Sequence, residues 1–152
     1  MINVREITQR DVRLLEYWRI TDFHDNEEKF GFEAAMTVYE ETVEDMLSQP
    51  LFIVQDDFGN SIGFVGFYNL RESKRYYGIR MYLVPQSRGR GYGKELVDVC
   101  KYLAEECGFK KVFAVVLKNN RRSLQLFRNN GDWEPDDKKE TSDKLYFAYS
   151  TS

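Results

Sequence analysis

The sequence predicts a mixed α/β fold in one domain over residues 1–152, with helices packed on a sheet of six or seven strands. Three observations support this. The 152 residues match the length of a single domain. Strand-like and helix-like patterns follow the order β-α-α-β-β-β-α-β-α-β. The hydrophobic content of 42%, with 11 Phe, 10 Tyr and 2 Trp, can fill one core, and no linker or internal repeat divides the chain.

The first fifty residues predict one strand and two helices. "INVREI" alternates well enough for a strand. Thr8 and Asp11 form a capping-box start, after which an apolar stripe (Val12, Leu15, Trp18) indicates a helix. Residues 21–32 are polar, acidic and irregular and are expected to form a loop. Thr42 and Asp45 repeat the capping signal for a short helix that ends before Pro50.

Five more strands are expected in the rest of the chain. "LFIVQ" and "SIGFVGFYNL" flank the turn "DDFGN" and indicate a hairpin. "YYGIRMYLV", residues 76–84, follows the turn "RESKR". "KVFAVVL" is almost wholly apolar, which is typical of a strand buried on both faces. "KLYFAYS" follows the charged loop "PDDKKETSD" as the last strand.

Two helices are expected among these strands. One begins near Gly93, ends at Gly108 and carries an apolar face (Leu96, Cys100, Leu103, Cys107). The other lies in "NNRRSLQLFRNNG" and is closed by Gly131. Cys100 and Cys107 lie seven positions apart in the expected helix, which places their Cα atoms ~10 Å apart. Because a disulfide spans roughly 7 Å at most, both thiols are expected to be free.

Composition and charge exclude several classes of function. The net charge of −3 argues against a general nucleic-acid binder. No apolar run approaches the ~20 residues of a membrane span, and the N-terminus lacks the apolar segment of a signal peptide. The protein is therefore expected to be cytoplasmic, with no membrane partner. No metal is expected, since His24 is the only histidine and no residues have ligand spacing.

Charge is distributed unevenly along the chain. Between residues 22 and 45, Lys29 is the only base among nine acids: Asp22, Asp25, Glu27, Glu28, Glu33, Glu40, Glu41, Glu44 and Asp45. This stretch would suit a cationic acceptor, or it is simply a solvated helical face. Between residues 118 and 128 there are four bases and no acid: Lys118, Arg121, Arg122 and Arg128. That cluster would face an anion or solvent.

A glycine-rich loop, "VPQSRGRGYGKEL", joins a strand to a helix. Backbone N–H groups at a helix N-terminus have no intrahelical partner, and the helix dipole adds partial positive charge there. Glycines let an anion approach these amides, and Arg88, Arg90 and Lys94 add positive charge. The loop therefore predicts a phosphate or pyrophosphate cradle; the alternative is a connector with solvated arginines. Neither the P-loop pattern nor the dinucleotide-binding pattern matches.

Two blocks carry a family resemblance. Arg88, Gly91 and Gly93 form R-x-x-G-x-G before the helix opening "KELVDVC", which resembles the acetyl-CoA pyrophosphate loop of the GNAT superfamily of N-acetyltransferases. The second block resembles the family pattern N-x-x-[AS]-x-x-L-[YF]-x-x-x-G, with matching residues Asn120, Ser123, Leu126, Phe127 and Gly131. The order of elements is similar over essentially the whole chain. The resemblance implies a GNAT-like acyl-CoA N-acyltransferase fold with mostly antiparallel strands and about four helices.

The resemblance also implies a set of site residues. Acetyl-CoA would be the co-substrate, and its pantetheine arm would enter a gap between the fourth and fifth strands. Residues expected to bind it are Leu83, Val84, Arg88, Gly89, Arg90, Gly91, Tyr92, Gly93, Lys94, Asn120, Ser123 and Phe127. The N–H of Leu83 would stabilise the oxyanion of the tetrahedral intermediate. The amine acceptor would attack directly, without a covalent enzyme intermediate.

The chain departs from the family pattern at the general base. Many relatives use a carboxylate on the fourth strand, but "YYGIRMYLV" contains no acid, and Gly78 stands at the usual glutamate place. Asp22, His24 and Asp25 are candidate substitutes, in the loop where such proteins bind acceptors. A surface position is the alternative for His24.

The chain also departs at the general acid. The usual tyrosine is replaced by Phe127, which cannot protonate the departing thiolate. Tyr68, Tyr82 and Tyr146 are candidates for that role, or they simply pack in the sheet.

The sequence thus predicts an acyltransferase that moves an acetyl group from acetyl-CoA to a primary amine. The acceptor would be a small cationic amine, an aminoglycoside, a polyamine or a protein amino group. The departures at the general base and the general acid leave open the alternative of a non-catalytic acyl-CoA-binding or sensing domain. A nucleotide or nucleic-acid phosphate binder is a remote third hypothesis. A homodimer is expected by resemblance, because the last strands often pair between subunits in this family.

Overall fold

The computed structural model describes residues 1–39 and 41–151 of the chain. Its sheet has the strand order β1-β2-β3-β4-β5-β7-β6. The strands are β1 (Asn3–Glu6), β2 (Leu51–Gln55), β3 (Ser61–Arg71), β4 (Tyr76–Leu83), β5 (Lys111–Leu117), β6 (Glu134–Pro135) and β7 (Lys144–Ser150). The helices are α1 (Val12–Phe30), α2 (Phe32–Tyr39), α3 (Val43–Leu47), α4 (Tyr92–Glu106) and α5 (Arg121–Arg128). Short 3-10 turns occupy Gln9–Asp11, Glu72–Lys74 and Pro85–Ser87.

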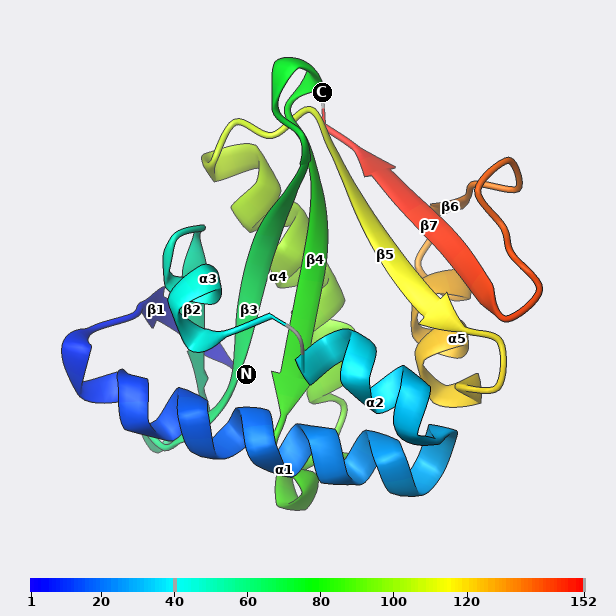
Figure 1. Cartoon of the computed structure of the whole chain (residues 1–152). Helices are drawn as coiled ribbons and strands as arrows, with labels where there is room; N and C mark the ends of the chain where they lie inside the picture. Colours follow the sequence, from blue (N-terminus) through cyan, green and yellow to red (C-terminus); the bar gives the residue numbers. More distant parts are fainter. Residues whose placement is uncertain (40, 152) are drawn as a thin grey trace.

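The strand pairings confirm the mixed, mostly antiparallel sheet. Every neighbouring pair is antiparallel except β4 and β5, which are parallel. The helix α4 provides the crossover between those two parallel strands, as parallel strands require. Figure 1 shows α1 and α2 in front of the sheet and α4 behind it.

Each face of the sheet buries its own hydrophobic cluster. On β2 and β3, Ile53 and Phe64 pack with Leu15 and Trp18 on the α1 side. The intervening residues Val54 and Val65 belong to the larger cluster with α4 and α5, which includes Leu96, Cys100, Leu124 and Phe127. This alternation follows from the period of two in a β-strand. Cys100 and Cys107 are both free thiols, as expected, with Cys100 buried.

The strands β4 and β5 separate along their length. They pair only at Tyr76–Lys111, Tyr77–Val112 and Gly78–Phe113. Beyond Gly78, β4 remains paired with β3 up to Leu83, while β5 remains paired with β7 up to Leu117. Figure 1 shows the two strands meeting at one end and diverging toward the C-terminal end of α1 and α2. The resulting V-shaped gap positions the site.

The N-terminal helical region differs from the expectation. Residues 21–32 were expected to form a loop, but α1 continues to Phe30 and stops at Gly31, whose φ is +95°. The prediction also missed α2 entirely. The last turns of α1 line a cavity with polar side chains, so they carry no apolar stripe there, and the amphipathic pattern that marks a core-facing helix fades.

The start of the helical region matches its capping signal. Asp11 is buried, and its carboxylate accepts from the Thr8 N–H at 2.8 Å. Arg5 binds the same carboxylate through two nitrogens at 2.8 and 2.9 Å. These bonds hold the pKa of Asp11 well below its usual range, the Arg5 hydrogen bond being the largest cause. The turn before α1 is thereby tied to β1.

Candidate active site

A cavity of about 640 Å³ lies in the gap between β4 and β5. Its wall includes side chains from both strands, from the C-terminal half of α1, from α2 and from α5. Seven of the expected residues line it: Asp22, Asp25, Leu83, Arg88, Asn120, Ser123 and Phe127. Tyr68 and Tyr82 line it as well. The fold therefore brings together residues from Asp22 to Phe127 that lie far apart in the sequence.

The backbone of Leu83 faces this cavity. The Val84 N–H donates to the Ile62 carbonyl of β3 at 2.8 Å, so the Val84 amide points toward β3. Peptide groups of successive residues in an antiparallel strand point to alternate sides. The N–H and C=O of Leu83 therefore point away from β3, into the gap. The Leu83 carbonyl accepts there from Arg88 Nε at 2.9 Å.

The glycine loop has the geometry of an anion cradle. Gly89 and Gly91 have φ values of +76° and +85°, which favour glycine, and a Cβ added at either would meet no heavy atom within 4 Å. Gly91 is the N-cap of α4, so the first amides of that helix have no intrahelical partner. Gly93 has a different reason for lacking a side chain, since its Cβ would lie 3.1 Å from Leu126 Cδ1 of α5.

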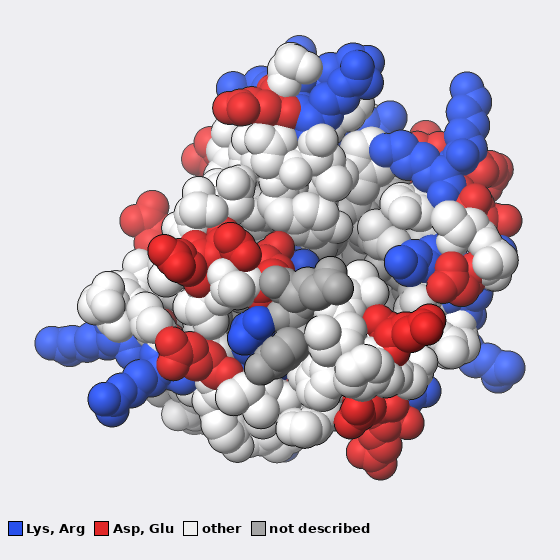
Figure 2. All heavy atoms as spheres, viewed as in Figure 1, with Lys and Arg blue, Asp and Glu red and all other residues white. Residues whose placement is uncertain are grey.

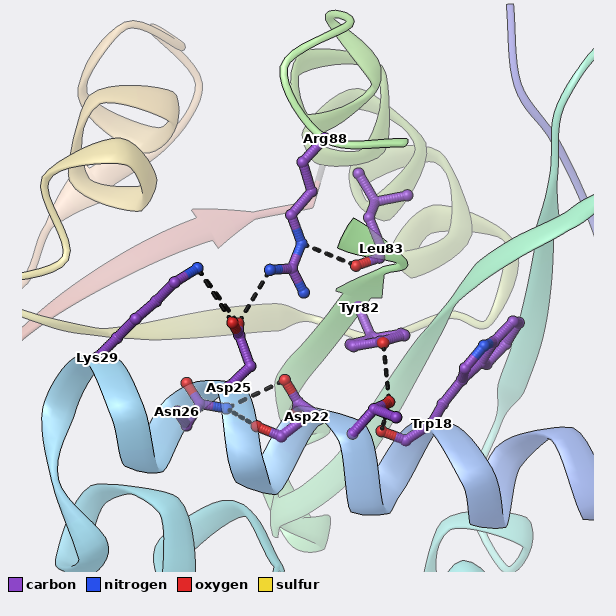
Figure 3. Close-up of polar contacts among 9 residues, drawn as sticks. Trp18, Asp22, Asp25, Asn26, Lys29, Tyr82, Leu83 and Arg88 are labelled. Atoms are coloured by element: carbon purple, nitrogen blue, oxygen red, sulfur yellow. Dashed lines mark hydrogen bonds and ion pairs between the residues drawn. The ribbon is translucent and has the colours of Figure 1, made fainter. Parts of the chain in front are cut away.

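Arg88 does not add its charge to the outside of the loop. Its guanidinium turns into the cavity, where Nη1 donates to Asp25 Oδ2 at 2.9 Å. The same guanidinium lies 5.7 Å from the centre of the Tyr82 ring. The exposed charges of the loop are those of Arg90 and Lys94. Figure 3 shows Arg88 reaching from the loop to α1, across the end of β4.

The cavity-facing side of α1 carries four polar residues: Asp22, Asp25, Asn26 and Lys29. Asp25 is paired with Arg88 at 2.9 Å and with Lys29 at 3.3 Å. Burial acts to raise the pKa of Asp25, but the bonds from Arg88 and Lys29 outweigh it and lower that pKa. Asp25 is therefore held as a carboxylate.

Asp22 lies in a different environment on the same helix. Its Oδ1 accepts from Asn26 Nδ2 at 3.0 Å, and within the described residues no cation comes within the 4.0 Å of an ion pair. Burial raises the pKa of Asp22 to about 6, an effect that Arg88 and Arg80 reduce and Asp25 increases. The cavity thus contains one carboxylate fixed by cations and another with free lone pairs.

The three tyrosines that are candidates for the general acid lie in different surroundings. Tyr82 Oη is 3.1 Å from Thr21 Oγ1, and burial raises the pKa of Tyr82. Tyr68 faces Gly78 across the β3–β4 pair, and a Cβ at Gly78 would come within 2.1 Å of the Tyr68 ring. Tyr68 therefore occupies the space where a glutamate side chain at position 78 would begin. Tyr146 is not among the residues that line the cavity.

The structure does not bring His24 to the cavity. Its side chain is 69% exposed and lies 4.0 Å from Glu27 on the outer side of α1. The residues around His24 were expected to form a loop; their helical conformation directs Asp22 and Asp25 inward and His24 outward, since positions i and i+3 share a face but i+2 does not.

The second sequence block forms the opposite wall. Asn120 is the N-cap of α5 and accepts from the Ser123 N–H at 3.3 Å. Phe127 is 2% exposed, packed edge-on against Trp133 and stacked on Phe147. Of the basic cluster at residues 118–128, only Arg122 lines the cavity, and Lys118 is paired with Glu140 at 3.4 Å.

The acid-rich stretch does not converge on the cavity. Of its nine acids, Asp22 and Asp25 line the wall, and Glu41 is paired with Arg80 at 3.3 Å. Exposed positions hold five others: Glu27, Glu28, Glu33, Glu44 and Asp45. Glu40 lies outside the described residues. Figure 2 shows acidic side chains spread over the lower part of this face rather than gathered at one point.

Across the described residues, no group of three or more His, Cys, Asp or Glu side chains could hold a metal ion. In the same part of the chain, no helix has the length and apolar character to cross a membrane.

Comparison with known proteins places this geometry in context. The sequence model of the acetyltransferase (GNAT) family matches residues 13–131. A curated relative of Bacillus subtilis (strain 168), named "Putative phosphinothricin acetyltransferase YwnH", is 29% identical over 87 residues. That match covers 55% of this chain and 53% of the relative, so it spans about half of each protein.

Solved structures share the fold over nearly the whole chain. A GNAT superfamily phosphinothricin acetyltransferase from Sinorhizobium meliloti, in complex with AcCoA, has a TM-score of 0.73 and 19% identity, covering 99% of this chain and 89% of its own. Spermidine N-acetyltransferase from Vibrio cholerae, in complex with CoA and spermine, has a TM-score of 0.69 and 17% identity, covering 98% and 95%. At these identities the likeness concerns the fold.

Proposed function

This chain belongs to the acetyltransferase (GNAT) family, and from that premise we propose that it is an acyltransferase that transfers the acetyl group of acetyl-CoA to a primary amine. The observation that carries the proposal is the cavity between β4 and β5, into which the Leu83 backbone points, beside a glycine loop that opens α4. This arrangement can hold a phosphorylated thioester and present its carbonyl to a backbone N–H.

The residues at the loop fit the anionic end of acetyl-CoA. Gly89 and Gly91 have open space where a Cβ would stand, at the N-terminal end of α4, where partial positive charge favours a phosphate. Arg90 and Lys94 add exposed charge beside it. Asn120, Ser123 and Phe127 would line the pantetheine arm from the α5 side. The bound thioester supplies an acyl group activated for attack by an amine.

Leu83 is the proposed oxyanion donor. Its N–H points into the gap, and a backbone donor aimed at the developing negative charge is typically worth ~3 kcal/mol. The Val84 N–H is already bonded to Ile62, so Leu83 has the amide that remains available to a ligand. Because thiol pKa values lie near 8.5, the thiolate can leave without a proton from a tyrosine at position 127.

The charges in the cavity do not select a polycation as the acceptor. Asp22 and Asp25 line it, but so do Lys29, Arg80 and Arg88. The proteins similar to this chain are named for chemically distinct amines, phosphinothricin and spermidine. We therefore propose a small amine as acceptor and a panel that includes both of these compounds, aminoglycosides and peptide N-termini, with thiol release from acetyl-CoA as the readout.

Binding of CoA tests the glycine loop directly. Gly91→Asp places a carboxylate in front of the α4 amides, and we expect CoA affinity measured by calorimetry to fall at least 100-fold. Gly59→Asp is the matched control, because Gly59 has a φ of +81° and open space around its Cβ but lies in the β2–β3 turn. Equal affinities in the two variants would contradict the proposed cradle.

A non-catalytic acyl-CoA-binding role is the second candidate. It is favoured by Phe127 at the position of the family's tyrosine and by Gly78 at the position of its glutamate. This role predicts CoA binding without thiol release for every amine in the panel. It also predicts that Phe127→Tyr leaves release undetectable, whereas a slow enzyme is accelerated by a new general acid.

A further inference from the structure

Two carboxylates of α1 project toward one cavity from the same face of the helix, at positions i and i+3. Asp25 is bound by the Arg88 guanidinium and by Lys29 Nζ, which occupy its oxygens. Asp22 accepts one hydrogen bond, from Asn26, and its remaining lone pairs are free of ion pairs among the described residues. A group that receives a proton needs such a lone pair, so the two acids are not equivalent.

Asp22 also lies on the reaction side of the cavity. Figure 3 shows it on the part of α1 that faces the end of β4, below Leu83 and Arg88, with the Tyr82 ring to its upper right. Asp22, Tyr82 and Leu83 line the same cavity. An amine placed between α1 and the Leu83 N–H would therefore have the Asp22 carboxylate on one side and the thioester carbonyl on the other.

We propose that Asp22 accepts the proton of the acceptor amine, in place of the carboxylate that β4 lacks. This inference rests on the proposed acetyl transfer. The amine nitrogen forms a bond to the acetyl carbon, the C–S bond breaks, and its electron pair leaves on the CoA sulfur. The proton lost by nitrogen goes to Asp22, which then returns it to solvent or to the thiolate.

The protonation behaviour of Asp22 suits this role. A general base works best when its pKa lies near the operating pH. The burial that raises the Asp22 pKa to about 6 leaves most of the carboxylate ionised at neutral pH and makes it more basic than an exposed aspartate. Asp25, with its lowered pKa, is a weaker base in the same cavity.

The groups that surround Asp22 set the pH at which it titrates. Arg88 from the loop and Arg80 from β4 lower its pKa, while Asp25 on its own helix raises it. Asn26 donates a hydrogen bond, and Tyr82 is the titratable neighbour on β4. From α2, the described residues that line the cavity are Ala34 and Thr37, which carry no charge.

The test is a pH–rate profile of the full-length protein with an amine that supports thiol release. We expect kcat/KM of the unaltered protein to fall below about pH 6, where Asp22 becomes protonated. Asp22→Asn keeps the shape and can still accept from Asn26, but it should reduce kcat by about 10²- to 10⁴-fold. The same substitution should also abolish the decline of kcat/KM near pH 6.

Two further variants define the controls. Glu27→Gln changes an exposed acid of the same helix and should leave both the rate and the acid limb unchanged. His24→Ala tests another acid–base candidate of this segment; loss of the acid limb in that variant overturns the role of Asp22. Calorimetry with CoA verifies that Asp22→Asn is folded and binds its co-substrate.

The outcomes distinguish this inference from the proposed function. If the unaltered protein releases thiol and Asp22→Asn retains both its rate within threefold and its acid limb, the role of Asp22 is overturned while acetyl transfer stands. If the unaltered protein releases no thiol with any amine of the panel, acetyl transfer and the role of Asp22 are overturned together.

Discussion

At the scale of single residues, the environment rather than the residue type decides what a carboxylate does. Asp22 and Asp25 are three positions apart on α1 and both face the cavity. Cations lower the pKa of Asp25, whereas burial raises that of Asp22. Pairs of acids whose pKa values are driven in opposite directions are a recurring feature of catalytic sites.

The raised pKa of Asp22 makes a prediction about stability. The folded state binds this proton more tightly than the unfolded state, where the pKa is near 3.8. The free energy of unfolding should therefore decrease as pH rises from about 4 to 6, and the full cost of burying the charge applies above pH 6. Asp22→Asn removes that cost and should stabilise the protein by about 1–3 kcal/mol at pH 7.

Urea denaturation of both proteins at pH 4, 5.5 and 7 measures this difference. The increase in the free energy of unfolding caused by Asp22→Asn should shrink toward zero near pH 4, where the aspartate is largely protonated in both the folded and the unfolded state. A variant that is less stable than the unaltered protein at pH 7 would show that the charge of Asp22 is stabilised by its surroundings. Stability gained together with activity lost is expected for a residue that serves catalysis.

At the scale of elements, the pairing of β3 with β4 explains why the usual carboxylate is missing. Tyr68 and Gly78 are direct cross-strand partners, and the Tyr68 ring covers the glycine. An aromatic side chain on one strand and a glycine on the next can compensate for each other in this way. With that space filled, the proposed base comes from another element, and α1 is one of the elements whose side chains line the cavity.

This packing predicts a strong coupling between the two residues. Gly78→Ala should destabilise the protein by about 1–3 kcal/mol, because its Cβ would overlap the Tyr68 ring. In a Tyr68→Ala background the same change should be nearly neutral. A double-mutant cycle followed by thermal or urea unfolding should therefore give a coupling energy of at least about 1 kcal/mol.

The control for this cycle is Gly131→Ala. A Cβ at Gly131 meets no atom within 4 Å, so this substitution should change stability little in either background. Additive effects of Gly78→Ala and Tyr68→Ala would mean that the ring moves aside without cost.

At the scale of the whole molecule, the two sheet halves are stabilised independently of the gap between them. The strand β4 is paired with β3 along its whole length, and β5 is paired with β7 along its whole length. Each half also packs on helices, with one hydrophobic cluster on either face of the sheet. The cavity can therefore stay open without leaving either strand unsupported.

The hydrogen bonding at the outer edge of β7 is relevant to the expected homodimer. This edge is bonded to the chain's own residues, β6 at Phe147 and Ala148, and the backbone of Asp136 and Thr141 farther along. Pairing of last strands between two subunits would have to displace these bonds. The homodimer stays a prediction, which light scattering after size-exclusion chromatography can measure.

Occupancy of the cavity should stabilise the whole chain. A ligand that binds only the folded state at 100 times its Kd adds about 2.7 kcal/mol. For a protein of this size we expect CoA at that concentration to raise Tm by roughly 5–10 °C. ATP at the same concentration should raise it less, since it lacks the pantetheine arm that the gap would accommodate. Equal shifts of Tm with CoA and ATP would favour the hypothesis that the protein binds the phosphates of nucleotides in general.

The sequence by itself determined the features that depend on interactions between residues close together in the chain. The capping boxes at Thr8 and Thr42 were confirmed, as was the glycine stop of α4 at Gly108. The two family blocks also follow from local order, because Arg88, Gly91 and Gly93 lie close together at the start of α4 and Asn120 caps the helix that it precedes. Each of these features depends on contacts within a few residues.

Only the tertiary structure decided how the site is arranged. The Arg88–Asp25 bond joins residues 63 positions apart, and Tyr82 meets Thr21 over 61 positions. No local pattern encodes such contacts, so Arg88 was expected at the phosphate loop and residues 21–32 were expected to be irregular. The last turns of α1 carry polar residues because they line a cavity, and which of their carboxylates stays free depends on cations that other elements supply.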